Sequence, residues 1–137
     1  MNNQTLFQPN LFGIFDGDLA DYVKHNFLLQ GDLKNTFLEI DSKIKVPDQG
    51  STASVALIEG DTVTLANAGD SRWVVAKNGR VVKASEDHTF GIFQIKDAIR
   101  IKKAGGEIKD KKLDGVLNIS RALGYYRFKN NSDLAPE

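Results

Sequence analysis

Three aspartates stand where a folded chain could use them as ligands for a hard cation. Asp16 and Asp18 flank Gly17 directly after the apolar residues 11–15, and Asp70 follows a second strand-like run. Mg²⁺ and Mn²⁺ prefer carboxylate, carbonyl and water oxygens. Two carboxylates at one rim of a sheet repel each other, and a divalent cation relieves that repulsion. The alternative is structural, because an Asp-Gly pair forms tight turns and Asp70 can cap a turn with its own side chain.

Other kinds of catalytic site have less support. The chain has no cysteine, which excludes disulfides, thiolate nucleophiles and cysteine-ligated zinc. Of the two histidines, His25 falls inside a helical pattern and is expected at the surface. His88 follows Asp87 in a polar loop, where a structural bond to a neighbouring segment is expected. The sequence contains neither standard phosphate-binding loop nor an HExxH zinc motif.

Composition limits the class of protein. A chain of 137 residues with 41% hydrophobic and 26% charged residues is expected to form one globular domain. Its 18 basic and 18 acidic residues cancel, so neither nucleic acid nor a membrane surface is an expected partner. The sequence has no signal-peptide pattern and no apolar run near the ~20 residues of a membrane span. An intracellular location, cytoplasmic or nuclear, is expected.

A sheet must hold the carboxylates, and helices must cover it. We expect residues 1–10 to be a loose end and residues 11–15 to form a buried strand. Asp18 is the candidate N-cap of a helix over residues 19–29, and Asp32 that of a second helix ending near Ile44. Both helices have one apolar face, as expected for helices that cover a sheet.

The second half of the chain carries hairpin signals. Gly60-Asp61 separates two runs of small and β-branched residues, and Asn78-Gly79 suits a type I′ turn. These turns predict an antiparallel meander. A further helix is expected over residues 94–104, and short strands over 107–109 and 116–119. The pattern as a whole predicts an α+β fold with helices packed on a sheet.

Six motifs in order give the chain a recognisable pattern: FGIFDGD, GSTASVALI, LANAGDSRWVV, SEDH, RIKKAGG and GVLNISRALG. In this order they resemble the type-2C, metal-dependent serine/threonine protein phosphatases (the PPM family). The resemblance runs from Leu11 to about Lys129. Each motif alone is short, and the order of all six carries the resemblance.

The resemblance implies an αββα sandwich, two antiparallel sheets covered by helices, with two metal ions at one edge. In that family the aspartate corresponding to Asp16 bridges two Mg²⁺ or Mn²⁺ ions, and the carbonyl of the glycine corresponding to Gly17 binds one of them. The position of Asp70 is associated with an additional, weaker metal site. The implied reaction is hydrolysis of phosphoserine or phosphothreonine in a phosphoprotein substrate by a metal-activated water.

The sequence departs from the family pattern at several positions. Asp18 stands where the family has a histidine thought to act as general acid, and Tyr125 replaces the aspartate of the family's RALGD. Residues 1–10 contain neither the arginine nor the acids of the family's first strand. The family's later metal-binding aspartates would lie beyond Glu137. We therefore expect residues 11–137 to form a partial domain that lacks an N-terminal strand and C-terminal strands and helices.

This leaves three hypotheses about the function of the chain. The first is a phosphatase-like domain whose catalytic site is incomplete in this chain. The alternatives are a non-catalytic relative that acts as a protein-interaction module, and a fragment of a longer active phosphatase. An incomplete sandwich would also expose sheet edges, so self-association through those edges is expected.

Overall fold

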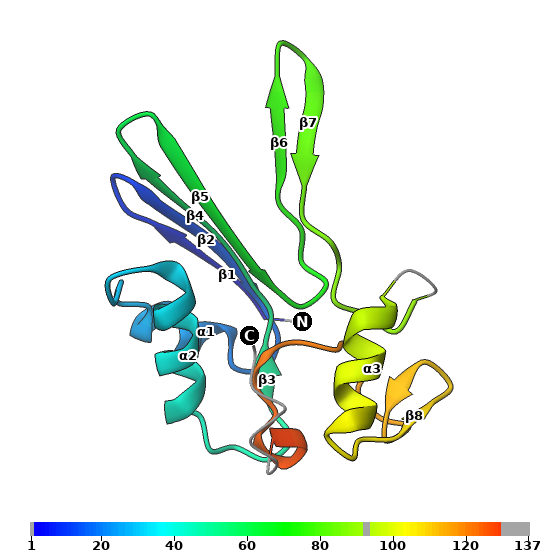
Figure 1. Cartoon of the computed structure of the whole chain (residues 1–137). Coiled ribbons are helices and arrows are strands. Elements are labelled where there is room, and N and C mark those ends of the chain that lie inside the picture. Colours follow the sequence, from blue (N-terminus) through cyan, green and yellow to red (C-terminus); the bar gives the residue numbers. More distant parts are fainter. Residues whose placement is uncertain (1, 92–93, 130–137) are drawn as a thin grey trace.

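The structure is a computed structural model, which describes residues 2–91 and 94–129 (Figure 1). Its helices are α1 (Ala20–Asn26), α2 (Leu33–Lys43) and α3 (Ile95–Lys103), with a 3₁₀ turn at Tyr126–Lys129. The strands are β1 (Asn3–Phe7), β2 (Leu11–Asp16), β3 (Gly50–Ser51), β4 (Ala53–Glu59), β5 (Thr62–Ala68), β6 (Val74–Lys77), β7 (Arg80–Ala84), β8 (Ile108–Lys109), β9 (Lys112–Leu113) and β10 (Leu123–Gly124). This confirms the predicted α+β class. Residues 130–137 of the expected partial domain lie outside the described residues.

One antiparallel sheet of four strands, in the order β1-β2-β4-β5, holds the principal core. The helices α1 and α2 lie against one end of this sheet (Figure 1). Alternate side chains of β2 and β4, among them Leu11, Phe15, Val55 and Leu57, are almost fully buried there. They meet the apolar faces of the helices, because period-2 strands and amphipathic helices each present one apolar side.

The prediction that residues 1–10 form a loose end is wrong. Asn3–Phe7 forms strand β1, which pairs with β2 in a register running from Asn3↔Asp16 to Phe7↔Phe12. Pro9 and Asn10 form a two-residue hairpin loop, closed by the backbone bonds Gln8 N–H to Leu11 O (2.9 Å) and Leu11 N–H to Gln8 O (3.4 Å). Short loops of this kind join antiparallel strands directly. Strand pairing therefore orders a segment that its polar composition made look loose.

The predicted cap of the first helix is also wrong. The N-cap position of α1 is Leu19, with no capping bond from a side chain, so Asp18 does not cap this helix. The first turn is instead anchored by backbone contacts, with Ala20 N–H bonded to Gly17 O (3.1 Å) and Leu19 N–H bonded to Gly50 O (3.1 Å). In α2 the predicted cap is confirmed, because Asp32 Oδ1 accepts from Asn35 N–H at 2.7 Å.

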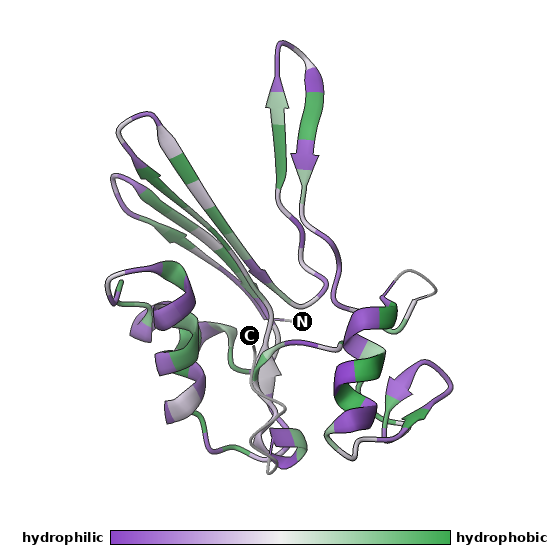
Figure 2. Ribbon diagram, in the orientation of Figure 1, coloured by the Kyte–Doolittle hydropathy of each residue, from purple (hydrophilic) through white to green (hydrophobic). Residues whose placement is uncertain are grey.

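The predicted meander is two separate hairpins. The β4–β5 hairpin turns at Gly60-Asp61 as predicted, and the β6–β7 hairpin turns at Asn78-Gly79, where both residues have positive φ (52° and 73°). In the described residues, β6 pairs with β7 and not with β5, and the pair projects away from the rest of the fold (Figure 1). Hydrophobic residues lie along both of its strands, exposed to solvent (Figure 2).

A smaller core lies beneath α3. It is made by the side chains of Phe90, Ile101, Leu113 and Phe128. The prediction of a strand over residues 116–119 is wrong, since these described residues form no strand. Two isolated bridges form there, Leu113↔Leu117 and Thr89↔Ile119. No helix of the described residues is long and apolar enough to span a membrane.

The last described segment returns to the first half of the chain. Strand β10 pairs with β3, and Asp41 of α2 accepts both the Gly124 N–H (2.7 Å) and the Lys129 ammonium (2.5 Å). The side chains of Asp41 and Lys129 are only 12% and 15% exposed. This contact joins the two cores.

Candidate metal centre

Asp16 ends strand β2 and is held there by Thr52. The Asp16 N–H donates to Thr52 Oγ1 (3.2 Å), and the Thr52 N–H donates to the Asp16 carbonyl (2.8 Å). The Thr52 and Ser71 hydroxyls are 2.5 Å apart. Three of the sequence motifs, GSTA, FDGD and GDSR, therefore meet at Thr52. The hydroxyl and the amide of Thr52 thus each hold the backbone of Asp16. This gives Asp16 the rigid mounting that a ligand position requires.

Gly17 turns the chain sharply after Asp16. Its φ is +137°, and a Cβ placed on it would lie 2.4 Å from the Gly50 carbonyl oxygen. Only glycine fits this position, because both the dihedral angle and the contact exclude a side chain. The Gly17 carbonyl, which the resemblance assigns to a metal, accepts the Ala20 N–H at the start of α1.

Gly17→Ala is expected to lower the free energy of unfolding by about 2–3 kcal/mol, because it adds a steric collision to the cost of a left-handed residue. Urea denaturation measures this loss. Gly31→Ala is the matched control, since Gly31 has φ +73° but nothing within 4 Å of the added Cβ. That control is expected to lose about 1 kcal/mol. Equal losses in the two variants would contradict the close contact with Gly50.

Asp70 is exposed in the connection between β5 and β6, and the preceding residue is fixed by His88. Gly69 N–H donates to His88 Nδ1 (3.2 Å), and His88 N–H donates to the Gly69 carbonyl (3.0 Å). The expected structural role of His88 is confirmed by these two bonds. Burial lowers the pKa of His88, and the neighbouring charges of Asp97, Arg121, Arg100 and Glu86 act in both directions.

The described fold is expected to lose stability as the pH falls below about 6.5, the ordinary pKa of histidine. The unfolded chain takes up a proton at His88 before the folded chain does, so the loss begins there and continues down to the lower folded pKa. Protonation of Nδ1 would also remove the acceptor for Gly69 N–H. Thermal melts between pH 7.5 and 5 measure the effect.

His88→Asn keeps an acceptor near the Nδ1 position and is expected to flatten this pH dependence. His25→Asn is the control, because His25 lies on the exposed face of α1 and bonds only within its own helix turn. A His88→Asn variant with the unchanged pH dependence would show that another group is responsible.

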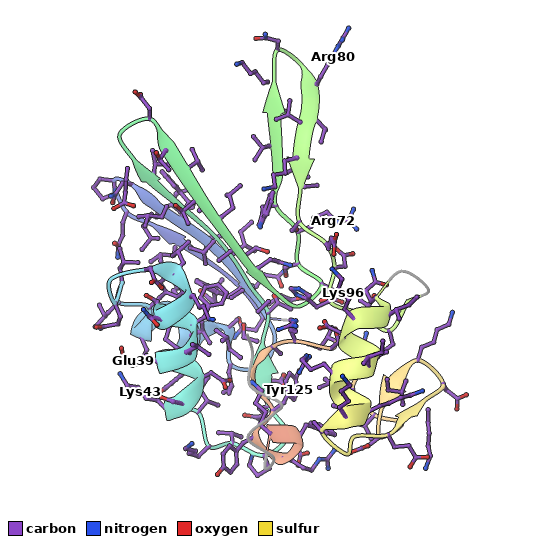
Figure 3. The ribbon with its side chains drawn as sticks, viewed as in Figure 1. Glu39, Lys43, Arg72, Arg80, Lys96 and Tyr125 are labelled. Carbon is purple, nitrogen blue, oxygen red and sulfur yellow. The ribbon has the colours of Figure 1, made fainter. Side chains whose placement is uncertain are left out.

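Tyr125 packs against Gly50, whose carbonyl oxygen lies next to Gly17. Its ring packs on Gly50, where an added Cβ would lie 2.3 and 2.4 Å from Cδ2 and Cε2 of the ring. Burial, followed by the charges of Asp18, Asp70 and Asp16, raises the pKa of Tyr125. Figure 3 shows Tyr125 in the middle of the molecule, between the side of α2 and that of α3. The sequence marked Tyr125 only as a departure from a motif, because its distance of over 100 positions from Asp16 hides their proximity.

A second polar group, also missed in the sequence, lies between α3 and the segment before β10. Asp97 accepts bonds from Arg121 Nη2 (2.7 Å) and Ser120 Oγ (2.7 Å) and pairs with Arg100 Nε (3.4 Å). The Asp97 side chain is 9% exposed. Its spacing of three residues from Arg100 was a usable signal, since such pairs meet on a helix surface.

A family model described as "Protein phosphatase 2C" matches residues 10–137. The chain belongs to the protein phosphatase 2C family. Among its relatives, "Probable protein phosphatase 2C 3" of Paramecium tetraurelia is 34% identical over 161 residues, covering 93% of this chain and 53% of the relative. "Protein phosphatase 2C homolog 2" of Hypocrea jecorina is 36% identical over 162 residues, covering 99% of this chain and 36% of the relative. Human "Protein phosphatase 1G" is 45% identical over 94 residues, covering 66% of this chain and 16% of the relative.

This protein phosphatase 2C chain spans about half the length of the Paramecium relatives it matches. The aligned stretch of 161 residues is longer than the whole chain, so the relative carries residues inside the matched region that have no counterpart here. The matched region is therefore shorter in this chain than in that relative.

A divalent cation is implied by the protein phosphatase 2C family, and the residues present do not fit a two-metal centre. Across residues 2–91 and 94–129, no three His, Cys, Asp or Glu side chains group so as to hold an ion. The charges of Asp18, Asp70 and Asp16 all raise the pKa of Tyr125, but these side chains do not form a group that could hold an ion. Two neighbouring cations need several carboxylates to offset their mutual repulsion, and this rim supplies Asp16 alone on a rigid strand.

Proposed function

We propose that this chain is part of a protein phosphatase of the 2C type that hydrolyses phosphoserine and phosphothreonine in proteins with Mg²⁺ or Mn²⁺, and that residues 1–137 alone form an incomplete catalytic site. The observation that carries the proposal is the mounting of Asp16 at the end of β2 by Thr52. It supports a ligand role for Asp16, with Gly17 beside it and Asp70 on the neighbouring loop. The proposed location is the cell interior, cytoplasm or nucleus, where such phosphoproteins occur.

The incompleteness follows from the residues around Asp16. The position of the family's general-acid histidine is taken by the exposed Asp18. The described residues contain no group of three metal-binding side chains, so no hydrolytic step is assigned to them. Further ligands would have to come from a longer gene product.

The test compares turnover of p-nitrophenyl phosphate and of a phosphothreonine peptide, with Mn²⁺, before and after Asp16→Ala. For residues 1–137 the two rates are expected to agree. For a longer product that carries the remaining family motifs, Asp16→Ala is expected to lower the rate at least 100-fold. The control is Asp61→Ala, in the exposed β4–β5 turn. Asp16-dependent turnover by residues 1–137 would contradict the incomplete site, and a longer product indifferent to Asp16→Ala would contradict the phosphatase function.

A second candidate function is a protein-interaction module without catalysis. The Tyr125 ring against Gly50 favours it, because an aromatic side chain stands where the family motif carries an aspartate. Such a module would bind the phosphothreonine peptide in a fluorescence-polarisation assay, and the longer product would release no phosphate from it.

We also propose that the isolated chain self-associates. In the described residues, β1 and β5 are the outer strands of the main sheet, and Val63, Val81 and Val82 are 53–67% exposed. Unpaired edges and exposed apolar side chains favour pairing with a second copy. Light scattering after size exclusion is expected to show oligomers, fewer of them in Val63→Lys. A monomer over the full concentration range would contradict this.

A further inference from the structure

The β6–β7 hairpin has an apolar face and a cationic face. Residues that oppose each other on paired strands project to the same side, and neighbours along one strand alternate. The register shifts by one residue at Val82, and the pairs before and after the shift keep these faces. One face is apolar and is formed by Val74, Ala76, Val81 and Ala84, whose two valines are 54% and 67% exposed. The other face carries the cations of the hairpin: Lys77, Arg80 and Lys83.

These cations have no acidic counterpart on the hairpin. Residues 74–84 contain neither Asp nor Glu, although the charges of the whole chain cancel. Lys77 and Arg80 stand directly opposite each other across the strands, an arrangement in which like charges destabilise a hairpin. Among the described residues, no carboxylate pairs with either of them or with Lys83. Figure 3 shows Arg80 at the end of the hairpin far from the helices. Positive charge is therefore concentrated here without compensation.

The outer edge of β7 is also unpaired. Within the described chain, β7 pairs only with β6, and a two-stranded hairpin alone is marginally stable in water, so a third strand would stabilise it. The outer strands β1 and β5 of the main sheet contain no charged residue, whereas β7 carries Arg80 and Lys83. Pairing β7 with β7 of a second copy would bring cations beside cations. The edge of β7 therefore fits a strand that supplies negative charge.

We propose that the outer edge of β7 (Arg80–Ala84) binds an extended acidic segment of a partner protein as a third strand of the hairpin. Alternate side chains of that segment would be Asp or Glu on the cationic face and apolar residues on the apolar face. In strand addition of this kind, backbone hydrogen bonds provide affinity and alternate side chains provide specificity. The proposal goes beyond the phosphatase function and does not depend on it, because the hairpin contains none of the residues assigned to the candidate metal centre.

Fluorescence polarisation with a labelled peptide of alternating Glu and Val tests this on residues 1–137. Saturable binding is expected. A peptide with the same residues arranged as a Glu block and a Val block is expected to bind about tenfold more weakly, because it cannot place Glu on one face and Val on the other. Equal affinity for the two peptides would overturn the proposal, as would no binding of the alternating peptide.

Reversing the charges of β7 tests the location. The double variant Arg80→Glu/Lys83→Glu is expected to raise the dissociation constant of the alternating peptide at least about tenfold, since two attractions become repulsions. Lys112→Glu is the matched control, because Lys112 is exposed on β9 of another two-stranded hairpin, and it is expected to bind as the wild type does. Equal losses in the control and the double variant would overturn the proposal.

Two methylated peptides test the backbone pairing without any change to the protein, so the result stands even where the double variant fails to fold. Each peptide is methylated at alternate backbone nitrogens. One has lost the N–H groups that face β7, and the other has lost those that face solvent. Only the first is expected to lose binding. Unchanged binding of both would mean attraction between charges without a third strand, which would overturn the proposal.

Other occupants of the hairpin give different results. Binding to vesicles that contain phosphatidylserine, with no binding of the alternating peptide, would assign the hairpin to a membrane surface. Oligomers that dissociate in the double variant, again without peptide binding, would assign the edge to a second copy. Either result would overturn the proposal. None of these measurements uses phosphatase activity, so this proposal and the proposed function fail separately.

Discussion

Replacing Phe15 with alanine is expected to lower the free energy of unfolding by about 3–5 kcal/mol, the range found when a buried phenylalanine is truncated. Phe15 is 0% exposed, and its ring is 5.5 Å from that of Phe27, which in turn is 5.9 Å from Phe37. These three rings connect β2 with α1 and α2. Loss of the Phe15 ring leaves a cavity that no neighbouring side chain can fill without moving. Chemical denaturation, followed by circular dichroism, measures the loss.

Phe7→Ala is the matched control for this prediction. Phe7 is on β1 in the same sheet, but 76% exposed, with a single ring contact to Phe12. Its truncation is expected to cost no more than about 1 kcal/mol. Since Asp16 follows Phe15 directly, the Phe15→Ala variant is also expected to loosen the mounting of the proposed ligand. Similar losses in Phe7→Ala and Phe15→Ala would mean that the core is not where this structure has it.

Asp97→Ala is expected to cost about 3–5 kcal/mol, the loss typical of removing one partner of a buried ion pair. Asp97 receives charged hydrogen bonds from Arg121 and one from Ser120, and Arg100 lies beside it. The arginine side chains are only 18% and 23% exposed, so the substitution leaves two largely buried cations without this counter-charge. Urea denaturation at neutral pH measures the effect.

Asp87→Ala tests the same interaction at the surface. Asp87 pairs with Arg72 at 2.7 Å, but the Arg72 side chain is 56% exposed. Exposed pairs contribute about 1 kcal/mol or less, so a much smaller loss is expected. A loss in Asp87→Ala equal to that in Asp97→Ala would contradict the assignment of the large effect to burial.

Acid provides a further check on Asp97. Burial raises the pKa of its carboxyl, but the bonds from Arg121 and Ser120 and the arginine charges outweigh burial, so the pKa lies below its usual value. A depressed carboxyl pKa stabilises the fold above the unfolded pKa, near 4, and this contribution disappears as the pH falls through the folded value. The effect of His88 begins at higher pH. A pH titration of stability therefore distinguishes the contribution of Asp97 from that of His88.

Local signals in the sequence predicted most of the elements correctly. Asn78-Gly79 and Gly60-Asp61 each specify a hairpin through the residues of the turn itself, and Asp32 caps α2 with its own side chain. Such features depend on neighbours in the chain, and the sequence displays those neighbours. Each of the six motifs that identified the family is likewise a short run of neighbouring residues, and their order can be followed along the sequence.

The failures concern contacts between distant segments. Residues 3–7 became a strand because β2 provides a ladder for them, and α1 begins after Asp18 because Gly50 and Gly17 accept its first N–H groups. The surroundings of the candidate site were hidden in the same way. Neither the mounting of Asp16 by Thr52 nor the stacking of Tyr125 on Gly50 leaves a pattern within any short window of sequence.

The bond between Asp41 and Lys129 has a consequence for the time course of folding. The two residues are 88 positions apart, and at 5–20 residues per second a ribosome needs roughly 4–18 s to travel from one codon to the other. During that interval the carboxylate of Asp41 has neither its ammonium partner nor the Gly124 amide, because neither residue has been synthesised. The contact that joins the two cores can therefore form only after the last described turn has been synthesised.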